Sequence, residues 1–141
     1  MVTDVSKKDQ FEALIAAAVR EFGRVDIMAN NAGIAMIQDF LDVTKADYDK
    51  VLGVNLEGAF WGTQAAARQM IAQGEGGVII NMSSINSGLA NPRVATYAIT
   101  KGGMNQITGH RRRRLCAQRY PRGWSWARHD RYRNGQGRIR L

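Results

Sequence analysis

The sequence predicts an α/β fold with a parallel sheet, and three features support this. Helical segments with one apolar face alternate along the chain with short apolar segments of strand length. The two clearest strand segments, residues 25–29 and 77–83, are apolar on both faces, so each is expected to have helices on either side. Long helical stretches separate the strands, which predicts right-handed strand–helix–strand crossovers.

Capping and stop signals delimit the helices. Residues 6–9 have the form of a capping box and are expected to start a helix that ends at Gly23. A second capping box at residues 44–47 is expected to open a long helix that reaches Gly74. A last helix is expected to start near residues 94–97, after a loop that contains proline.

The net charge of +8 is concentrated at one end of the chain. Residues 1–109 hold 9 Lys and Arg against 11 Asp and Glu, whereas residues 110–141 hold 11 Arg against the single Asp130. The first part therefore has the composition of a weakly acidic globular domain. The basic tail shows neither helical nor strand periodicity, and we expect it to be disordered.

Composition also restricts the class of protein. No apolar segment approaches the length of a membrane span, and nothing resembles a signal peptide. The one cysteine, Cys116, excludes a disulfide within the chain and offers no metal cluster. A cytoplasmic protein without a metal site is therefore expected.

Tyr97 and Lys101 are the first candidates for chemistry. Residues four apart share one face of a helix, and a nearby ammonium lowers the pKa of a tyrosine from about 10. Such a tyrosine can exchange a proton with an alcohol or a ketone. Ser84, thirteen residues before Tyr97 and at a strand end, can reach the same pocket. The alternative is a pair on a solvated helix face, with Ser84 as a strand-end cap.

Several motifs follow one another within residues 1–109. They are Asn-Asn-Ala-Gly at residues 30–33, Val54-Asn55, Asn-Met-Ser-Ser at residues 81–84, and Tyr97 to Lys101 followed by Gly102. In this order and spacing they resemble the short-chain dehydrogenase/reductase family. The resemblance implies an incomplete Rossmann-type, doubly wound parallel sheet. It also implies NAD or NADP as cofactor, a small alcohol or ketone as substrate, and assembly as a homo-oligomer.

The resemblance assigns catalytic roles to four residues. Ser84 is expected to hydrogen-bond the substrate oxygen, and Tyr97 to transfer the proton. Lys101 is expected to lower the pKa of the tyrosine and to contact the ribose hydroxyls. Asn55 is expected to support a helix kink and to take part in a proton relay through water. The alternative for Asn55 is a hydrogen bond to a carbonyl of its own helix.

Further residues are expected to bind the cofactor. The resemblance places Asn31, Ala32 and Gly33 near the adenosine ribose, where small residues allow close approach of the backbone. It also places Asp4 and Val5 against the adenine. For residues 31–33 the alternative is a plain turn after a strand. For Asp4 the alternative is a helix cap. The glycine-rich loop that binds the pyrophosphate is not found in the sequence, so the choice between NAD and NADP cannot be predicted.

Residues 110–141 show no recognisable motif of this family, and we expect the resemblance to stop near Gly109. We interpret them as the family's C-terminal region translated one nucleotide out of frame. Trp has a single codon, and when the reading frame is shifted by one base this codon becomes a codon for Gly. Trp124 and Trp126 would then supply glycines where the family has them. The alternatives are a basic extension that binds nucleic acid, with Tyr132 also able to stack on bases, and a non-catalytic remnant. The body of the chain gives the nucleic-acid alternative no support.

Overall fold

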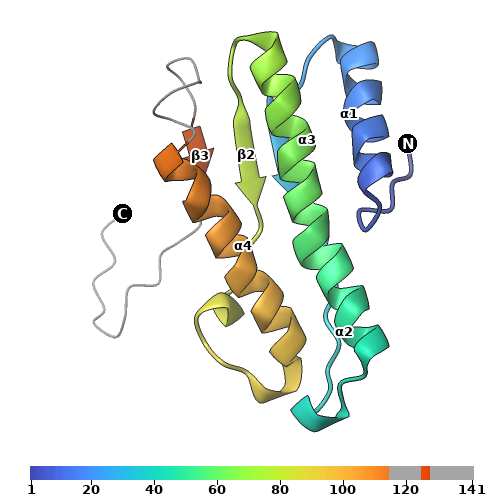
Figure 1. Ribbon diagram of the computed structural model, residues 1–141, viewed down its shortest axis with the longest axis vertical. Helices are drawn as coiled ribbons and strands as arrows, with labels where there is room; N and C mark the ends of the chain where they lie inside the picture. Colours follow the sequence, from blue (N-terminus) through green and yellow to red (C-terminus); the bar gives the residue numbers. More distant parts are fainter. Residues whose placement is uncertain (115–124, 128–141) are drawn as a thin grey trace.

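The computed structural model describes residues 1–114 and 125–127, with only the backbone described for residues 110–114 and 125–127. Four helices and three strands make up its regular structure in this part of the chain (Figure 1). In chain order they are α1 Lys8–Phe22, β1 Ile27–Asn30, α2 Lys45–Leu52, α3 Gly58–Gln73, β2 Val78–Asn81, α4 Ala95–Arg114 and β3 Ser125–Ala127. The predicted α/β class is confirmed.

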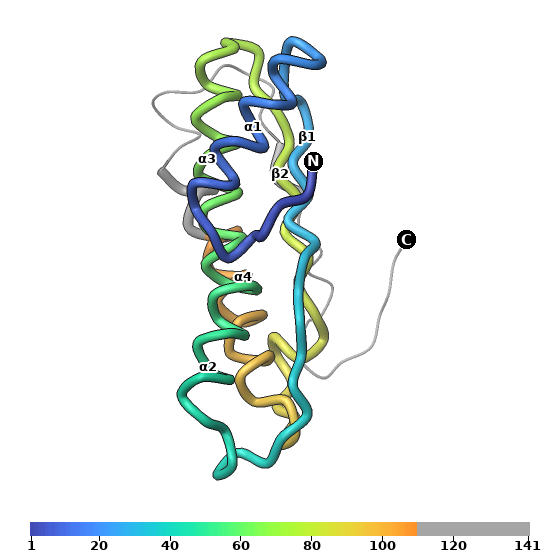
Figure 2. Tube along the Cα trace, turned by 90° about the vertical axis from the view of Figure 1, so that its right-hand side faces the viewer, coloured from blue at the N-terminus to red at the C-terminus, as the bar shows by residue number. Residues whose placement is uncertain are grey.

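The strands form a parallel sheet in the order β1-β2-β3. Ile27 pairs with Val78 at one end of β1 and β2, and Asn30 pairs with Asn81 at the other. Helices α1 and α3 lie on the same side of β1 and β2, as Figure 2 shows. Helix α3 belongs to the crossover that returns the chain from the end of β1 to the start of β2, whereas α1 precedes β1 and packs against α3.

The tail requires a correction to the sequence prediction. Helix α4 continues past Gly109 as far as Arg114, and Ser125–Ala127 pairs in parallel with β2. The expectation of a disordered tail is therefore wrong for these two segments. Residues 115–124 and 128–141 lie outside the described residues, so for them disorder stays a prediction.

The first predicted cap also differs from the structure. Helix α1 starts at Lys8, and its N-cap residue Lys7 makes no side-chain capping bond. Ser6 instead donates its backbone N–H and its hydroxyl to Asp4 Oδ1, at 3.0 and 2.8 Å. These two bonds, the backbone one first, hold the pKa of Asp4 below its ordinary value. A nearby carboxylate thus uses the hydroxyl that was expected to cap the helix.

The other start and stop signals are confirmed. Thr44 Oγ1 accepts the backbone N–H of Asp47 at 3.1 Å and so caps α2. Gly23 and Gly74 end α1 and α3 with φ of 81° and 79°, a left-handed conformation that glycine adopts without strain. Between α2 and α3 the chain makes a π-helical turn at Gly53–Glu57, which the sequence did not reveal.

The hydrophobic core lies between the sheet and two helices. Ile15 from α1 and Met70 from α3 pack with Ile79 of β2, and Val25 closes the core at the entrance to β1. Met70 is fully buried, which suits a flexible thioether that fills space between a helix and a sheet. This core fixes the distance of α3 from the strands.

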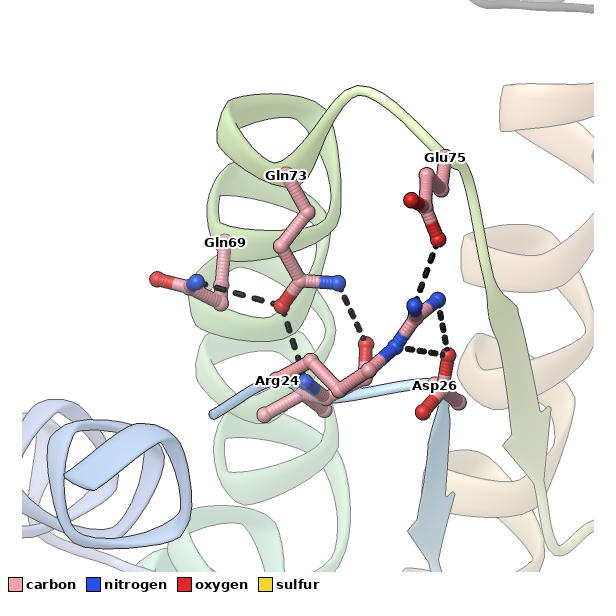
Figure 3. A network of polar contacts seen from close by, with 6 residues as sticks. Arg24, Asp26, Gln69, Gln73 and Glu75 are labelled. Atoms are coloured by element: carbon pink, nitrogen blue, oxygen red, sulfur yellow. Dashed lines mark hydrogen bonds and ion pairs between the residues drawn. The ribbon is translucent and has the colours of Figure 1, made fainter. Parts of the chain in front are cut away.

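Polar contacts join the turns that lead into β1 and β2 (Figure 3). Arg24 pairs with Asp26 in its own turn and with Glu75 in the turn before β2. Gln73 at the end of α3 accepts the backbone N–H of Val25 at 2.8 Å and donates to its carbonyl at 3.1 Å. The Gln73 amide therefore makes the two hydrogen bonds to the Val25 backbone that a residue of a neighbouring strand would make. This network holds the amino-terminal edge of the sheet together.

One face of the sheet lacks the expected helical cover among the described residues. Ile27 is 66% exposed, and Ala29 is also exposed. The prediction that both faces are covered is therefore wrong for this part of the chain. β1 is also an edge of the sheet as described, and an exposed apolar edge strand invites pairing with other chains.

We expect Ile27→Lys to reduce concentration-dependent association of the isolated chain, because a charge on an edge strand opposes strand pairing. Static light scattering over a concentration series measures the effect. Leu41→Lys is the matched control, since Leu41 is 92% exposed and lies outside the sheet. Equal effects of the two substitutions would show that net charge, and not the strand edge, controls association.

Candidate active site

Buried polar side chains connect the carboxyl ends of β1 and β2. Asn30 Nδ2 donates to Asn81 Oδ1 at 2.8 Å and to Thr63 Oγ1 of α3 at 2.9 Å. Asn81 Nδ2 in turn donates to Thr108 Oγ1 of α4 at 3.1 Å. Both asparagines and Thr63 are buried, so the hydrogen bonds compensate for lost hydration. The network ties both helices to the edge of the sheet at which the candidate residues gather.

Asn55 lies in the π-helical turn and is fully buried. Its Oδ1 accepts the backbone N–H of Ile34 at 2.8 Å, and its Nδ2 donates to the Ile34 carbonyl at 2.8 Å and to Thr100 Oγ1 at 3.2 Å. The alternative of a bond within its own helix is therefore wrong. Asn55 connects the loop after β1 with the helix that carries Tyr97 and Lys101.

Lys101 is buried beside these groups, with 3% of its surface exposed. Its Nζ donates to the Met82 carbonyl at 2.6 Å and lies 5.5 Å from the centroid of the Tyr97 ring. Burial lowers the pKa of Lys101, because the charged form loses hydration. The alternative of a solvated pair is thus wrong for the lysine, and the structure brings it close to the tyrosine as predicted.

Gly33 lies next to the Asn55 amide and the Lys101 ammonium. A Cβ placed on Gly33 would lie 3.4 Å from Asn55 Oδ1 and 3.7 Å from Lys101 Nζ. Of the three residues expected around the ribose, Gly33 is therefore the one beside Lys101. Both distances are ordinary van der Waals contacts, so the backbone at residue 33 lies close to both side chains.

Ser84 caps the short 3-10 turn Ile85–Ser87, accepting the backbone N–H of Asn86 at 3.2 Å. Accepting one bond leaves the hydroxyl hydrogen of Ser84 able to donate. Ser83, the neighbour with which it could be confused, donates its hydroxyl to Asn105 of α4 at 2.7 Å. The cap predicted as an alternative for Ser84 is present, and it is compatible with a contact to a substrate.

The residues expected to bind the adenosine part separate into two groups. Val5, Asn31 and Ala32 line one cavity of about 110 Å³, next to Gly58. A Cβ on Gly58 would lie 2.8 Å from the Val5 carbonyl oxygen, so the glycine allows this close packing. Asp4 does not line the cavity, and its carboxylate binds Ser6 in the turn before α1.

The contacts of three residues in the site were not predicted from the sequence. They involve Ile34, Thr100 and Asn105, whose partners are Asn55, Ser83 and Ser87. Only Asn105 carried a usable signal, since it follows Tyr97 and Lys101 at four-residue spacing on one helix face.

The family follows from comparison with known proteins. A family model described as short chain dehydrogenase matches residues 1–119. The chain belongs to the short-chain dehydrogenase family. It is 38% identical over 130 residues to 2-dehydro-3-deoxy-D-gluconate 5-dehydrogenase of Escherichia coli (strain K12), covering 92% of the chain and 47% of that relative. It is 46% identical over 101 residues to L-rhamnose 1-dehydrogenase (NAD(P)(+)) of Azotobacter vinelandii, covering 72% and 40%.

Solved structures of the family share the fold. A gluconate 5-dehydrogenase from Burkholderia cenocepacia J2315, in complex with NADP and tartrate, matches with a TM-score of 0.76 and 39% identity, over 84% of this chain and 46% of that one. A short-chain type dehydrogenase/reductase from Mycobacterium marinum matches with a TM-score of 0.80 and 30% identity, over 85% and 48%. The chain thus spans about half the length of its relatives. Among its described residues no helix is long and apolar enough to cross a membrane.

The buried Lys101 predicts a pH-dependent stability. Because burial holds the folded pKa of Lys101 below its ordinary value of about 10.4, the unfolded chain binds this proton more readily between the two values. Stability therefore rises with pH through this interval. We expect the stability of the wild type relative to Lys101→Met to rise between pH 7 and about 10, as the buried ammonium loses its proton.

Urea denaturation at pH 7, 8.5 and 10 measures this difference. Lys50→Met, at an exposed position of α2, gives the baseline for loss of a lysine charge. A stability difference for Lys101→Met that stays constant over this range would contradict the prediction.

Proposed function

We propose that residues 1–109 carry the active site of an NAD(P)-dependent oxidoreductase that acts on a small alcohol or ketone. One observation supports this most directly. Helix α4 presents Tyr97 and the buried Lys101 together, and Lys101 lies beside Gly33 and Asn55 at the carboxyl edge of the sheet. Ligands of open parallel sheets bind at this edge. Membership of the family and its named dehydrogenases support the same reaction class.

In the proposed reaction Tyr97 exchanges a proton with the substrate oxygen. The ammonium of Lys101, held by the Met82 carbonyl, lies 5.5 Å from the centroid of the Tyr97 ring. Ser84 donates its hydroxyl hydrogen to the same substrate oxygen and orients it. Hydrogen bonds from the hydroxyls of Ser84 and Tyr97 together stabilise the negative charge that develops on the substrate oxygen during the reaction.

Asn55 supports this site through its contacts. Both amide hydrogens are donated to protein groups, one to the Ile34 carbonyl and one to Thr100 Oγ1. A proton relay that includes Asn55 would therefore have to use its Oδ1 or its backbone groups. We assign to its side chain the task of holding the loop at Ile34 against α4.

The residues present fit part of a nicotinamide dinucleotide. The Gly33 backbone lies beside Lys101, where Lys101 would contact the ribose hydroxyls. Val5, Asn31 and Ala32 line the neighbouring cavity and would pack on the adenosine part. When bound, the nicotinamide supplies the hydride that is exchanged with the substrate carbon. Both NAD and NADP remain candidates: one relative is named for NAD(P)(+), and a similar structure contains NADP.

Turnover tests the proposal. The assay uses the longest in-frame gene product that contains residues 1–109, with NAD or NADP and two alcohols suggested by the names of the similar proteins, gluconate and L-rhamnose. Reduced nicotinamide is followed by absorbance. The expected result is oxidation of at least one secondary alcohol. Absence of turnover with all substrates and both cofactors, in a folded protein, would overturn the proposal.

We expect Tyr97→Phe to lower kcat by about 10²- to 10⁴-fold, because it removes the proton-transfer group while the ring stays in place. The KM of the cofactor should change little, and the circular dichroism spectrum should be unchanged. Tyr48→Phe, on α2, is the matched control. Retention of most of the activity in Tyr97→Phe would reject the proton-transfer role.

The 141-residue chain itself is expected to bind NAD and NADP weakly or not at all. Amides of a glycine-rich loop and a helix N-terminus supply much of the binding of the pyrophosphate, and the sequence has no such loop. Isothermal titration calorimetry with each nucleotide measures this. A dissociation constant in the micromolar range would contradict the expectation.

We also infer that residues from about His110 onward are translated out of frame. The change from 9 basic and 11 acidic residues before this point to 11 Arg and a single Asp after it supports the inference. Nucleotide sequencing of codons 105–115 in the source genome tests it. A one-base insertion or deletion is expected, and an intact reading frame would show that the basic tail is genuine.

A further inference from the structure

Asn105 joins helix α4 to the loop that carries Ser84. Its Oδ1 accepts the hydroxyl of Ser83 at 2.7 Å, and its Nδ2 donates to Ser87 Oγ at 2.9 Å. The two serines stand on either side of Ser84, so one amide holds both ends of this short segment. Asn105 follows Lys101 by one helical turn, on the face that also presents Tyr97.

The loop is already ordered within itself. Ser84 caps the 3-10 turn Ile85–Ser87 by accepting the N–H of Asn86. We therefore treat the loop as one unit, whose position relative to α4 depends on the contacts between the loop and the helix. Asn81 and Met82 also contact α4, through Thr108 and Lys101, but both precede the loop. Among the side-chain hydrogen bonds of residues 1–109, only those of Asn105 connect the loop's two ends to α4.

We propose that Asn105 is a positioning residue that holds Ser84 in register with Tyr97 and Lys101. The inference rests on the proposed function of those three residues. Ser84 and Tyr97 must reach one substrate oxygen although they come from different elements, and displacements of about 1 Å can cost about 10²-fold in rate. A side chain that fixes the loop to the helix of Tyr97 limits such displacements.

The variants separate the hydrogen bonds from simple packing. Asn105→Leu removes both bonds at nearly constant volume. Asn105→Asp keeps two acceptor oxygens, and both serine hydroxyls can rotate to donate to them. Ser83→Ala and Ser87→Ala each remove one bond and serve as substitutes if Asn105→Leu fails to fold. Gln106→Leu is the matched control, since Gln106 is exposed at the next position of the same helix.

Amide hydrogen exchange of the 141-residue chain measures the loop directly. We expect exchange at residues 84–88 to be about tenfold faster or more in Asn105→Leu, since two hydrogen bonds are lost. Exchange in β2 should be unchanged, Gln106→Leu should match the wild type, and Asn105→Asp should restore most of the protection. Unchanged exchange at residues 84–88 in a folded Asn105→Leu, or in both serine variants, would overturn the inference.

Kinetics of the longer gene product provide the readout that a purely structural role would not move. We expect Asn105→Leu to lower kcat about ten- to hundredfold, with the KM of the cofactor nearly constant and recovery in Asn105→Asp. A normal kcat together with faster loop exchange would overturn the positioning role. If the wild type has no turnover, the proposed function fails, and hydrogen exchange alone decides whether Asn105 holds the loop.

Discussion

The buried amide pair of Asn30 and Asn81 determines how the sheet meets its helices. A buried amide is costly unless it is hydrogen-bonded, and Asn30 Nδ2 donates to Asn81 Oδ1 across β1 and β2, while Asn30 Oδ1 has no hydrogen-bond partner among the described residues. Their remaining bonds require Thr63 from α3 and Thr108 from α4 at the same place. A slip of one residue between the strands would turn one amide to the opposite face of the sheet. Strand register and helix position are therefore fixed together.

The geometry of the candidate site depends on this anchoring. α4 is held at Thr108, and Lys101 on the same helix reaches the Met82 carbonyl directly after β2. α3 is held at Thr63, and the π-helical turn before it places Asn55 against the loop after β1 and against Thr100. The site thus takes its shape from side-chain contacts between elements that are distant in sequence.

Local signals in the sequence predicted what depends on local physics. The glycine stops and the Thr44 cap were placed correctly, because they act within one helical turn. The proximity of Tyr97 and Lys101 followed from helix geometry alone. Contacts made over many residues were not predictable: Asn55 binds Ile34, which lies 21 residues away. The expected cap at Ser6 failed because Asp4 competes for the same hydroxyl, and competition between neighbours is not visible in a motif.

The π-helical turn at Gly53–Glu57 makes the length of this segment as important as its composition. A π turn takes up about one residue more than an α turn, and each residue of an α-helix advances its face by about 100°. Helices α2 and α3 are therefore out of phase, although the chain passes from one to the other without a loop. Losing a single residue here would allow one uninterrupted α-helix and would rotate Asn55 away from Ile34. Insertions and deletions are consequently expected to be less well tolerated at this turn than at an ordinary helix junction.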